Sequence, residues 1–442
     1  MRSVIIASNS SGGGKTTFTL GLMNLFKRKG YGIDGYKVGP DYIDGAFHKK
    51  VTGKPSRNLD VFLQGEEGVK AVYGRGTEEI GIVEGVMGVY DGTGSTLEGS
   101  TAHISKILGL PIILLISPKA SSLTLIAELK GILDFSDCDF KGIVLNNISK
   151  SYYDLLKKLI EEKLNIKVLG FMPRDERIAL KSRHLGLVQS EEVEDLQEKI
   201  DITADLIQEN VDVDSISEFM KETERFGDNY HIDDEGLRIG VAMDTAFSFY
   251  YRENIELLEE AGEVIYFSPL KDKRIPENLD LIYLGGGYPE VFRKELSGNK
   301  SFRESLYGEL QKGTPCYAEC GGLMYLMKSI EGEEMVGFFN GISSMTNTLN
   351  NFGYNSIEVS SNALVKKDLK INSHEFHKSK VVCSEKTVYK LRKIGYTGEI
   401  KEWTCGYVKN NALGAYGHIH FFSNLDFIRE IIKSCKKRNL EG

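Results

Sequence analysis

The chain has 442 residues and a formal net charge of −8 at pH 7, with 41% hydrophobic and 27% charged residues. This composition is typical of a globular protein long enough for two or three domains, and its acidic balance argues against nucleic acid as the main partner. The longest apolar run, Pro111–Ile116, is too short to span a membrane. The six cysteines show no Cys-x-x-Cys spacing, so we expect a cytoplasmic protein with neither a zinc site nor a disulfide framework.

The chain is expected to begin with a strand, Ser3–Ala7, rather than a signal peptide. The segment Gly12-Gly13-Gly14-Lys15-Thr16-Thr17 follows, and then a helix with one apolar face. Strand, glycine loop, Lys-Thr and helix are the order of a phosphate-binding loop. We predict that backbone N–H groups bind the phosphates, that Lys15 reaches the outer ones and that the Thr16 hydroxyl binds Mg²⁺. No lysine stands near Ser10, which favours a synthetase-type loop over that of a partition-type ATPase.

Strands and helices alternate up to about residue 189, which predicts a mostly parallel sheet covered on both faces. Helices are expected at Leu123–Leu133 and Tyr152–Leu164. The expected strands are Ser3–Ala7, Gly35–Val38, Gly81–Val83, Ile112–Ile116, Ile143–Leu145 and Val168–Phe171. We therefore assign residues 1–190 to an α/β domain that carries the phosphate-binding loop.

The next segment, residues 191–236, is strongly acidic. Seventeen acidic and three basic residues lie between Glu191 and Glu235. Leu196, Ile200 and Ala204 recur at helical spacing, and such a charge run is usually a solvated helix face. We expect an acidic helical linker here.

A second α/β domain is expected at residues 237–442. A helix is predicted at Phe302–Leu310. The predicted strands are Arg238–Met243, Val264–Phe267, Leu281–Leu284 and Pro315–Ala318.

Cys320 is the candidate nucleophile of this domain. It stands between the last of these strands and an apolar helix, with small residues around it, which is the pattern of a nucleophile elbow. The helix N-terminus is expected to favour the thiolate, and His418 far downstream supplies a base. Gly286 and Gly287, at the end of a strand, and Gly321 can direct N–H groups at an oxyanion. A lone cysteine would more often be a core residue, but the three features together favour catalysis.

The chain resembles the cobyrinic acid a,c-diamide synthase family from end to end. The resemblance rests on Lys37–Asp44, Glu84–Gly92, Pro173–Arg177, Ala246–Tyr251 and Leu284–Glu290, together with the segment around Cys320. It implies an N-terminal P-loop domain similar to dethiobiotin synthetase and a C-terminal class I glutamine amidotransferase domain. It also implies a reaction in which glutamine supplies ammonia. ATP activates the a and c acetate carboxylates of a cobalt corrinoid as acyl phosphates, which ammonia converts to amides.

Further residues of the N-terminal domain fit that chemistry. Glu84 follows an apolar strand, where a carboxylate can hold Mg²⁺, and Asp41 and Asp91 lie in loops after strands, where ligands bind. One of these aspartates is expected to hold a second Mg²⁺ or to orient the substrate carboxylate, although each is as readily a turn residue. The resemblance implies that Asn146 contacts adenine and that Tyr42 and Ile43 line the corrinoid site.

The histidines allow two interpretations. In the amidotransferase interpretation His418 is the base for Cys320, and His420 occupies the place of the usual triad carboxylate and orients His418. In the other, His374, His377, His418 and His420 form a four-ligand metal site. The first is favoured, and the roles of His374 and His377 stay open.

Three alternatives to cobyrinate amidation stay open. The tetrapyrrole could be nickel-sirohydrochlorin or the cobalt-free hydrogenobyrinate, because those enzymes share most of these motifs. The chain could also be a nucleotide-switched binding protein with an inert amidotransferase-like domain, although intact Cys320 and His418 argue against that. The expected partners are ATP with Mg²⁺, L-glutamine and cobyrinate or a related tetrapyrrole; the oligomeric state is not readable from the sequence.

Overall fold

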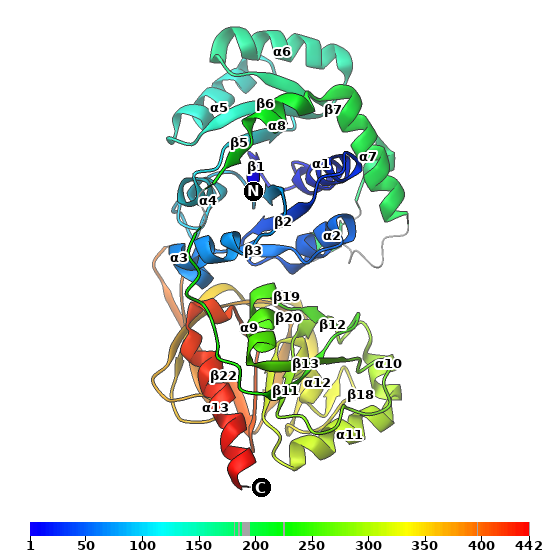
Figure 1. Cartoon of the computed structure of the whole chain (residues 1–442), viewed down its shortest axis with the longest axis vertical. Helices are drawn as coiled ribbons and strands as arrows, with labels where there is room; N and C mark the ends of the chain where they lie inside the picture. Colours follow the sequence, from blue (N-terminus) through cyan, green and yellow to red (C-terminus); the bar gives the residue numbers. More distant parts are fainter. Residues whose placement is uncertain (181, 184–185, 188–194, 224–225, 396, 442) are drawn as a thin grey trace. The chain divides into compact units, whose positions relative to one another are not determined.

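The computed structural model describes residues 1–180, 182–183, 186–187, 195–223, 226–395 and 397–441. The chain forms two compact units, Met1–Asn229 and Tyr230–Gly442 (Figure 1). The boundary expected between residues 190 and 191 lies outside the described residues. Among the described residues, no helix combines the length and the apolar character that a membrane span requires.

The first unit is built on a parallel sheet with the strand order β3-β2-β4-β1-β5-β6-β7. Every residue of β5 is buried, as expected for a central strand covered on both faces. The strands are β1 Arg2–Ser8, β2 Ile33–Val38, β3 Arg57–Leu59, β4 Ile80–Glu84, β5 Ile112–Ile116, β6 Phe140–Ile148 and β7 Val168–Pro173, with the short β8 Ser182–Arg183, β9 Gly186–Leu187 and β10 Lys221–Glu222. The predicted parallel sheet is confirmed.

Helices flank this sheet on both sides: α1 contacts α2 and α7, α3 contacts α4, and α5 contacts α6 (Figure 1). The helices are α1 Lys15–Arg28, α2 Tyr42–Thr52, α3 Val61–Gly74, α4 Thr101–Leu108, α5 Leu123–Asp134, α6 Lys150–Leu164, α7 Leu196–Asn210 and α8 Val213–Phe219, and η1 Glu176–Ile178 is a 3₁₀ turn.

One helix of the acidic segment, α7, packs on the first unit. Helix α7 lies against α1, and a Cβ atom at Gly21 of α1 would come within 2.5 Å of Thr203. Arg28 pairs with Asp201 and Asp205 of α7 at 2.7 and 2.5 Å. Leu196, Ile200, Ala204 and Ile207 of α7 are buried while most of its charges stay exposed, so this part of the expected linker is a structural layer of the first unit.

The second unit has a mixed sheet with the order β13-β11-β14-β16-β23-β22-β21-β19-β17-β18, of which β13 to β23 are parallel. The strands are β11 Leu237–Ala242, β12 Phe247–Phe249, β13 Gly262–Phe267, β14 Leu281–Leu284, β15 Gly286–Gly287, β16 Cys316–Glu319, β17 Ser329–Ile330, β18 Glu333–Glu334, β19 Gly341–Val359, β20 Lys370–Cys383, β21 Lys386–Ile394, β22 Ile400–Lys409, β23 Ala412–Ala415 and β24 His418–Ile419. The helices are α9 Arg252–Ala261, α10 Arg293–Gly298, α11 Lys300–Gln311, α12 Gly321–Leu326 and α13 Leu425–Glu441, and η2 Phe421–Ser423 is a 3₁₀ turn.

Candidate active sites

The predicted phosphate-binding loop connects β1 to α1, and Lys15, Thr16 and Thr17 form the first turn of that helix. Gly14 precedes the helix with a φ of 86°, a conformation that glycine adopts without steric cost. The N-cap residue Gly14 has no side chain to cap the first N–H groups of α1, which lie at the point where a phosphate is expected.

Lys15 is held against the loop by backbone oxygens. Its Nζ atom donates hydrogen bonds to the carbonyls of Ser10 and Met87 at 3.0 and 2.6 Å. Burial and the neighbouring ammonium of Lys37 lower the pKa of Lys15 to about 8. A phosphate would restore the charge balance around this lysine, because phosphate oxygens are stronger acceptors for an ammonium group than carbonyls are.

A buried polar cluster joins α1, β2, α2 and β4. The Thr16 hydroxyl donates to Glu84 Oε1 at 2.6 Å and lies 3.4 Å from Asp44 Oδ1. Lys37 Nζ lies 2.9 Å from Glu84 Oε1 and 2.5 Å from Asp44 Oδ2. Sequence reasoning predicted Thr16 and Glu84 but gave no role to Lys37 or Asp44; the signal for Lys37 was a lysine next to the last residue of the strand Ile33–Val38.

The charges of this cluster are linked. Burial would raise the pKa of Glu84, but Lys37 and His48 outweigh it and hold the Glu84 pKa well below its usual range. His48 Nε2 lies 2.8 Å from Glu84 Oε2. Burial and the Glu84 carboxylate raise the pKa of Asp44. Hydroxyl and carboxylate oxygens thus converge beside the phosphate-binding loop, and these are oxygen donors of the kind that Mg²⁺ takes alongside phosphates.

The other predicted residues of this domain lie around the same edge. Asp41 accepts from the N–H groups of Ile43 and Asp44 at 2.7 and 3.3 Å and so caps α2. Tyr42 and Ile43 belong to the first turn of α2. Asp91 is exposed and accepts from the Gly88 N–H at 2.8 Å. The structure gives Asp41 a capping function and leaves its predicted metal or substrate role a prediction.

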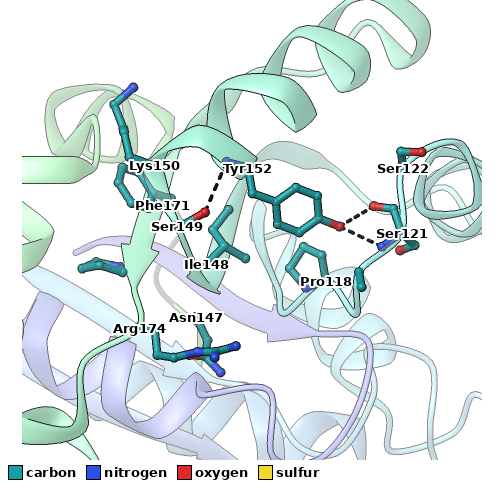
Figure 2. A pocket seen from close by; sticks show the side chains of 12 residues that line it. Pro118, Ser121, Ser122, Asn147, Ile148, Ser149, Lys150, Tyr152, Phe171 and Arg174 are labelled. Atoms are coloured by element: carbon teal, nitrogen blue, oxygen red, sulfur yellow. Dashed lines mark hydrogen bonds between the residues drawn. The ribbon is translucent and has the colours of Figure 1, made fainter.

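A pocket of about 860 Å³ opens at the carboxyl ends of β5, β6 and β7 (Figure 2). The Tyr152 hydroxyl accepts a hydrogen bond from the N–H of Ser121 and donates one to its carbonyl. Arg174 Nε lies 3.4 Å from Asn147 Oδ1. Asn146 directly precedes Asn147 and donates to the carbonyl of Gly13 at 2.9 Å. The pocket therefore begins next to the phosphate-binding loop, where the base of a nucleotide is expected.

Cys320 occupies a strained turn between β16 and α12. Its φ and ψ are 47° and −99°, which for a residue with a side chain is an unfavourable conformation of the kind found at functional sites. Its N–H donates to the carbonyl of Ala415 at 2.7 Å. Burial and the carboxylates of Glu290 and Glu375 raise the pKa of the thiol. The expected stabilisation of the thiolate by the helix N-terminus is therefore outweighed, and the thiol needs a base.

The predicted oxyanion glycines lie between the elbow and the candidate base. A Cβ atom at Gly321 would come within 3.1 Å of the Gly287 nitrogen, and one at Gly286 would lie 2.3 Å from His418 Cε1. The Gly322 N–H donates to the Gly285 carbonyl at 3.0 Å. Only glycine fits at 286, so the loop packs against the ring of His418.

His418 is buried in β24 beside other histidines. Its ring stacks on His374 with centroids 5.1 Å apart, and burial together with His374 and His377 lowers its pKa well below the usual value. A neutral imidazole is the form that can accept the thiol proton. Its Nδ1 atom lies 3.8 Å from Glu319 Oε2.

His420, the residue expected to orient His418, has different partners. Its Nδ1 atom accepts from the Phe422 N–H at 3.2 Å, and its Nε2 atom lies 3.3 Å from Glu253 Oε2. The nitrogen that accepts cannot carry the proton, so Nε2 donates to Glu253. The carboxylate beside His418, Glu319, received no role from the sequence.

His374 and His377 are bound separately. His374 Nε2 lies 2.8 Å from the Tyr251 hydroxyl, whereas His377 lies 2.9 Å from Glu375 Oε2 and stacks on Tyr416. Within the part of the chain that the structure describes, no group of three or more His, Cys, Asp and Glu side chains is arranged to hold a metal ion.

Both units match known families. Residues 4–188 match the CobQ/CobB/MinD/ParA nucleotide binding domain, and residues 238–425 match the CobB/CobQ-like glutamine amidotransferase domain. The chain therefore combines a nucleotide-binding P-loop domain with a glutamine amidotransferase domain, as the fold class predicted.

Relatives that match this chain over nearly its whole length identify the family more closely. The chain is 55% identical to the cobyrinate a,c-diamide synthase of Clostridium tetani, over 98% of this chain and 100% of that protein. It is 57% identical to that of Clostridium acetobutylicum and 41% identical to that of Listeria innocua, over 98% and 99% of this chain and the whole of each relative. The chain belongs to the cobyrinate a,c-diamide synthase family and is an amide-forming ligase that uses glutamine.

Proposed function

We propose that this protein converts the a and c acetate carboxylates of cobyrinate to amides, with ATP and glutamine as co-substrates, in cobalamin biosynthesis. The observation that carries the proposal is the presence of two candidate sites on one chain: a phosphate-binding loop with its carboxylate cluster, and a cysteine elbow with a neutral histidine. Full-length relatives at 55 and 57% identity bear that name.

The first site is suited to activating a carboxylate with ATP. Phosphoryl transfer depends on positioning and charge neutralisation rather than on covalent chemistry by the protein. Lys15 would hold the outer phosphates, and the pocket lined by Tyr152 and Asn147 would hold the nucleoside. Thr16 and Glu84 would bind Mg²⁺, with Asp44 beside them; the ion would neutralise charge on the phosphate oxygens.

The second site is suited to releasing ammonia from glutamine. His418 would take the proton of Cys320, whose sulfur then attacks the side-chain amide of glutamine. N–H groups of Gly286, Gly287 and Gly321 would stabilise the oxyanion. Water would then release glutamate from the thioester.

A substrate comparison tests the proposal. The purified protein is incubated with ATP, Mg²⁺ and glutamine and with cobyrinate, hydrogenobyrinate, sirohydrochlorin or nickel-sirohydrochlorin in turn. We expect diamide from cobyrinate with the highest kcat/KM, and a higher value for another tetrapyrrole would reassign the substrate. Glutamate release in the same assay excludes an inert amidotransferase-like domain.

A further inference from the structure

Glu319 is a buried carboxylate directly before the nucleophile, at the end of β16. It accepts hydrogen bonds from the hydroxyls of Tyr317 and Tyr283 at 2.8 and 3.0 Å and from the N–H of Ile419 at 3.1 Å. Only 1% of the residue is exposed. Burying a carboxylate is costly unless it is paired and hydrogen-bonded, and neither the elbow nor the oxyanion site as described above gives this one a role.

The candidate base, His418, lies beside Glu319. Glu319 Oε2 lies 3.8 Å from His418 Nδ1, and the Ile419 N–H that Glu319 accepts follows His418 in the chain. His420, which the sequence led us to expect as the residue that orients the base, contacts Phe422 and Glu253 through its two ring nitrogens. We propose that Glu319 is the positioning residue of the glutaminase site, which directs His418 through Nδ1 and stabilises its protonated form.

This arrangement assigns each proton. The thiol proton of Cys320 moves to Nε2 of His418, and the imidazolium then carries protons on both nitrogens. The Nδ1 proton faces Glu319, so the distance of 3.8 Å shortens to a charge-assisted hydrogen bond when the pair forms. His418 next gives its Nε2 proton to the departing amide nitrogen as the carbon–nitrogen bond breaks, and ammonia leaves. Glu319 keeps its charge throughout.

The groups around His418 and Glu319 leave Glu319 as the carboxylate placed to stabilise a protonated His418. His374 stacks on His418, and His377 and His374 both act to lower its pKa. Besides His418, the ionisable neighbours of Glu319 are the adjacent Cys320 and four tyrosines, of which Tyr283 and Tyr317 are in contact and Tyr250 and Tyr389 are within electrostatic range. Burial raises the pKa of Glu319 to about 7, and the two tyrosine hydroxyls in contact act to lower it. Glutaminase activity should therefore fall as the pH drops through this region.

The variant Glu319→Gln tests the inference, which rests on the proposed function. We expect the kcat of glutaminase to fall at least about tenfold, with the KM for glutamine within about threefold and amidation with ammonium salts unchanged. Alkylation of Cys320 by iodoacetamide should move to higher pH. Since alkylation needs no tetrapyrrole, it reports on Glu319 even if the proposed substrate is wrong. The control Glu253→Gln removes a buried carboxylate beside the other histidine and should leave the alkylation profile in place.

A second variant keeps the inference testable if Glu319→Gln does not fold. Tyr317→Phe removes one donor to Glu319 and no charge, so the pKa of Glu319 should rise and the acid limb of the glutaminase profile should move to higher pH. A wild-type kcat and alkylation profile in Glu319→Gln, or an unmoved acid limb in Tyr317→Phe, would overturn the role of Glu319.

Discussion

The Thr16 hydroxyl donates a hydrogen bond to Glu84 Oε1 at 2.6 Å, which ties the first turn of α1 to the end of β4. The same carboxylate pairs with Lys37 at 2.9 Å. Three elements of the first unit, α1, β2 and β4, therefore meet at one carboxylate, so Thr16 and Glu84, which are expected to bind Mg²⁺, are held in place by a helix and the sheet.

Removal of the Lys15 charge should stop ATP-dependent amidation with either nitrogen source. Loss of a charge-assisted phosphate contact costs about 3 kcal/mol at the transition state, or roughly a hundredfold in rate. Lys15→Ala is measured with glutamine and with ammonium, and the exposed Lys130→Ala serves as the control. Wild-type turnover in Lys15→Ala would contradict the phosphate-binding assignment.

Variants of Asp41 and Asp44 test whether each carboxylate takes part in the synthetase reaction. Asn neutralises the charge at both positions and also caps helices as well as Asp does, so Asp41→Asn preserves the start of α2. We expect Asp44→Asn and Asp41→Asn each to lower ammonium-dependent turnover at least about tenfold, with the Tm of Asp41→Asn within about 2 °C of wild type. Unchanged turnover in Asp41→Asn would confine Asp41 to capping.

Cys320→Ala should abolish amidation with glutamine and retain it with high ammonium, because only the release of ammonia uses the thiol. Initial rates with each nitrogen source provide the measurement. A variant that is also inactive with ammonium would show that Cys320 has another role.

Gly286→Ala should displace His418, because the added Cβ atom would lie 2.3 Å from Cε1 of that ring. A displacement of about 1 Å at a catalytic group costs roughly a hundredfold in rate, so glutamine-dependent turnover should fall by about that factor while ammonium-dependent turnover persists. Gly308→Ala, on α11 with no atom within 4 Å of the added Cβ, is the matched control. Equal effects in the two variants would refute the contact.

The two amides should be made one after the other at a single synthetase site, with release of the tetrapyrrole between the two reactions. The sequence contains one phosphate-binding loop and one Lys37–Asp44 segment, and two carboxylates set apart on a rigid macrocycle cannot both face one γ-phosphate. We expect free monoamide, at position c by family resemblance, to accumulate before diamide when the tetrapyrrole is in excess. In a pulse-chase with labelled acid, label that passes to diamide without entering the monoamide pool would show retention of the intermediate.

The parallel strands were predictable because burial on both faces makes them continuous apolar runs, as in Ile112–Ile116. The long antiparallel strands β19 to β22 were missed, since polar and apolar residues mix along them, as the buried and exposed positions of β19 show. Glu319 was missed for a related reason. Sequence gives its place before Cys320, but His418 comes beside it only in the fold, where β23 pairs with β16 and the chain continues directly into β24.

The packing of α7 on α1 determines where the chain can be truncated. Gly21 of α1 leaves room for Thr203, so the two helices approach closely at this point. A fragment that ends where the composition turns acidic would lose this cover and expose to water the part of α1 around Gly21 that Thr203 and Ile207 face. Helix α7, although it lies in a segment whose charge suggests a linker, therefore contributes to the folding of the nucleotide-binding unit. A fragment made to express this unit alone should extend to residue 229.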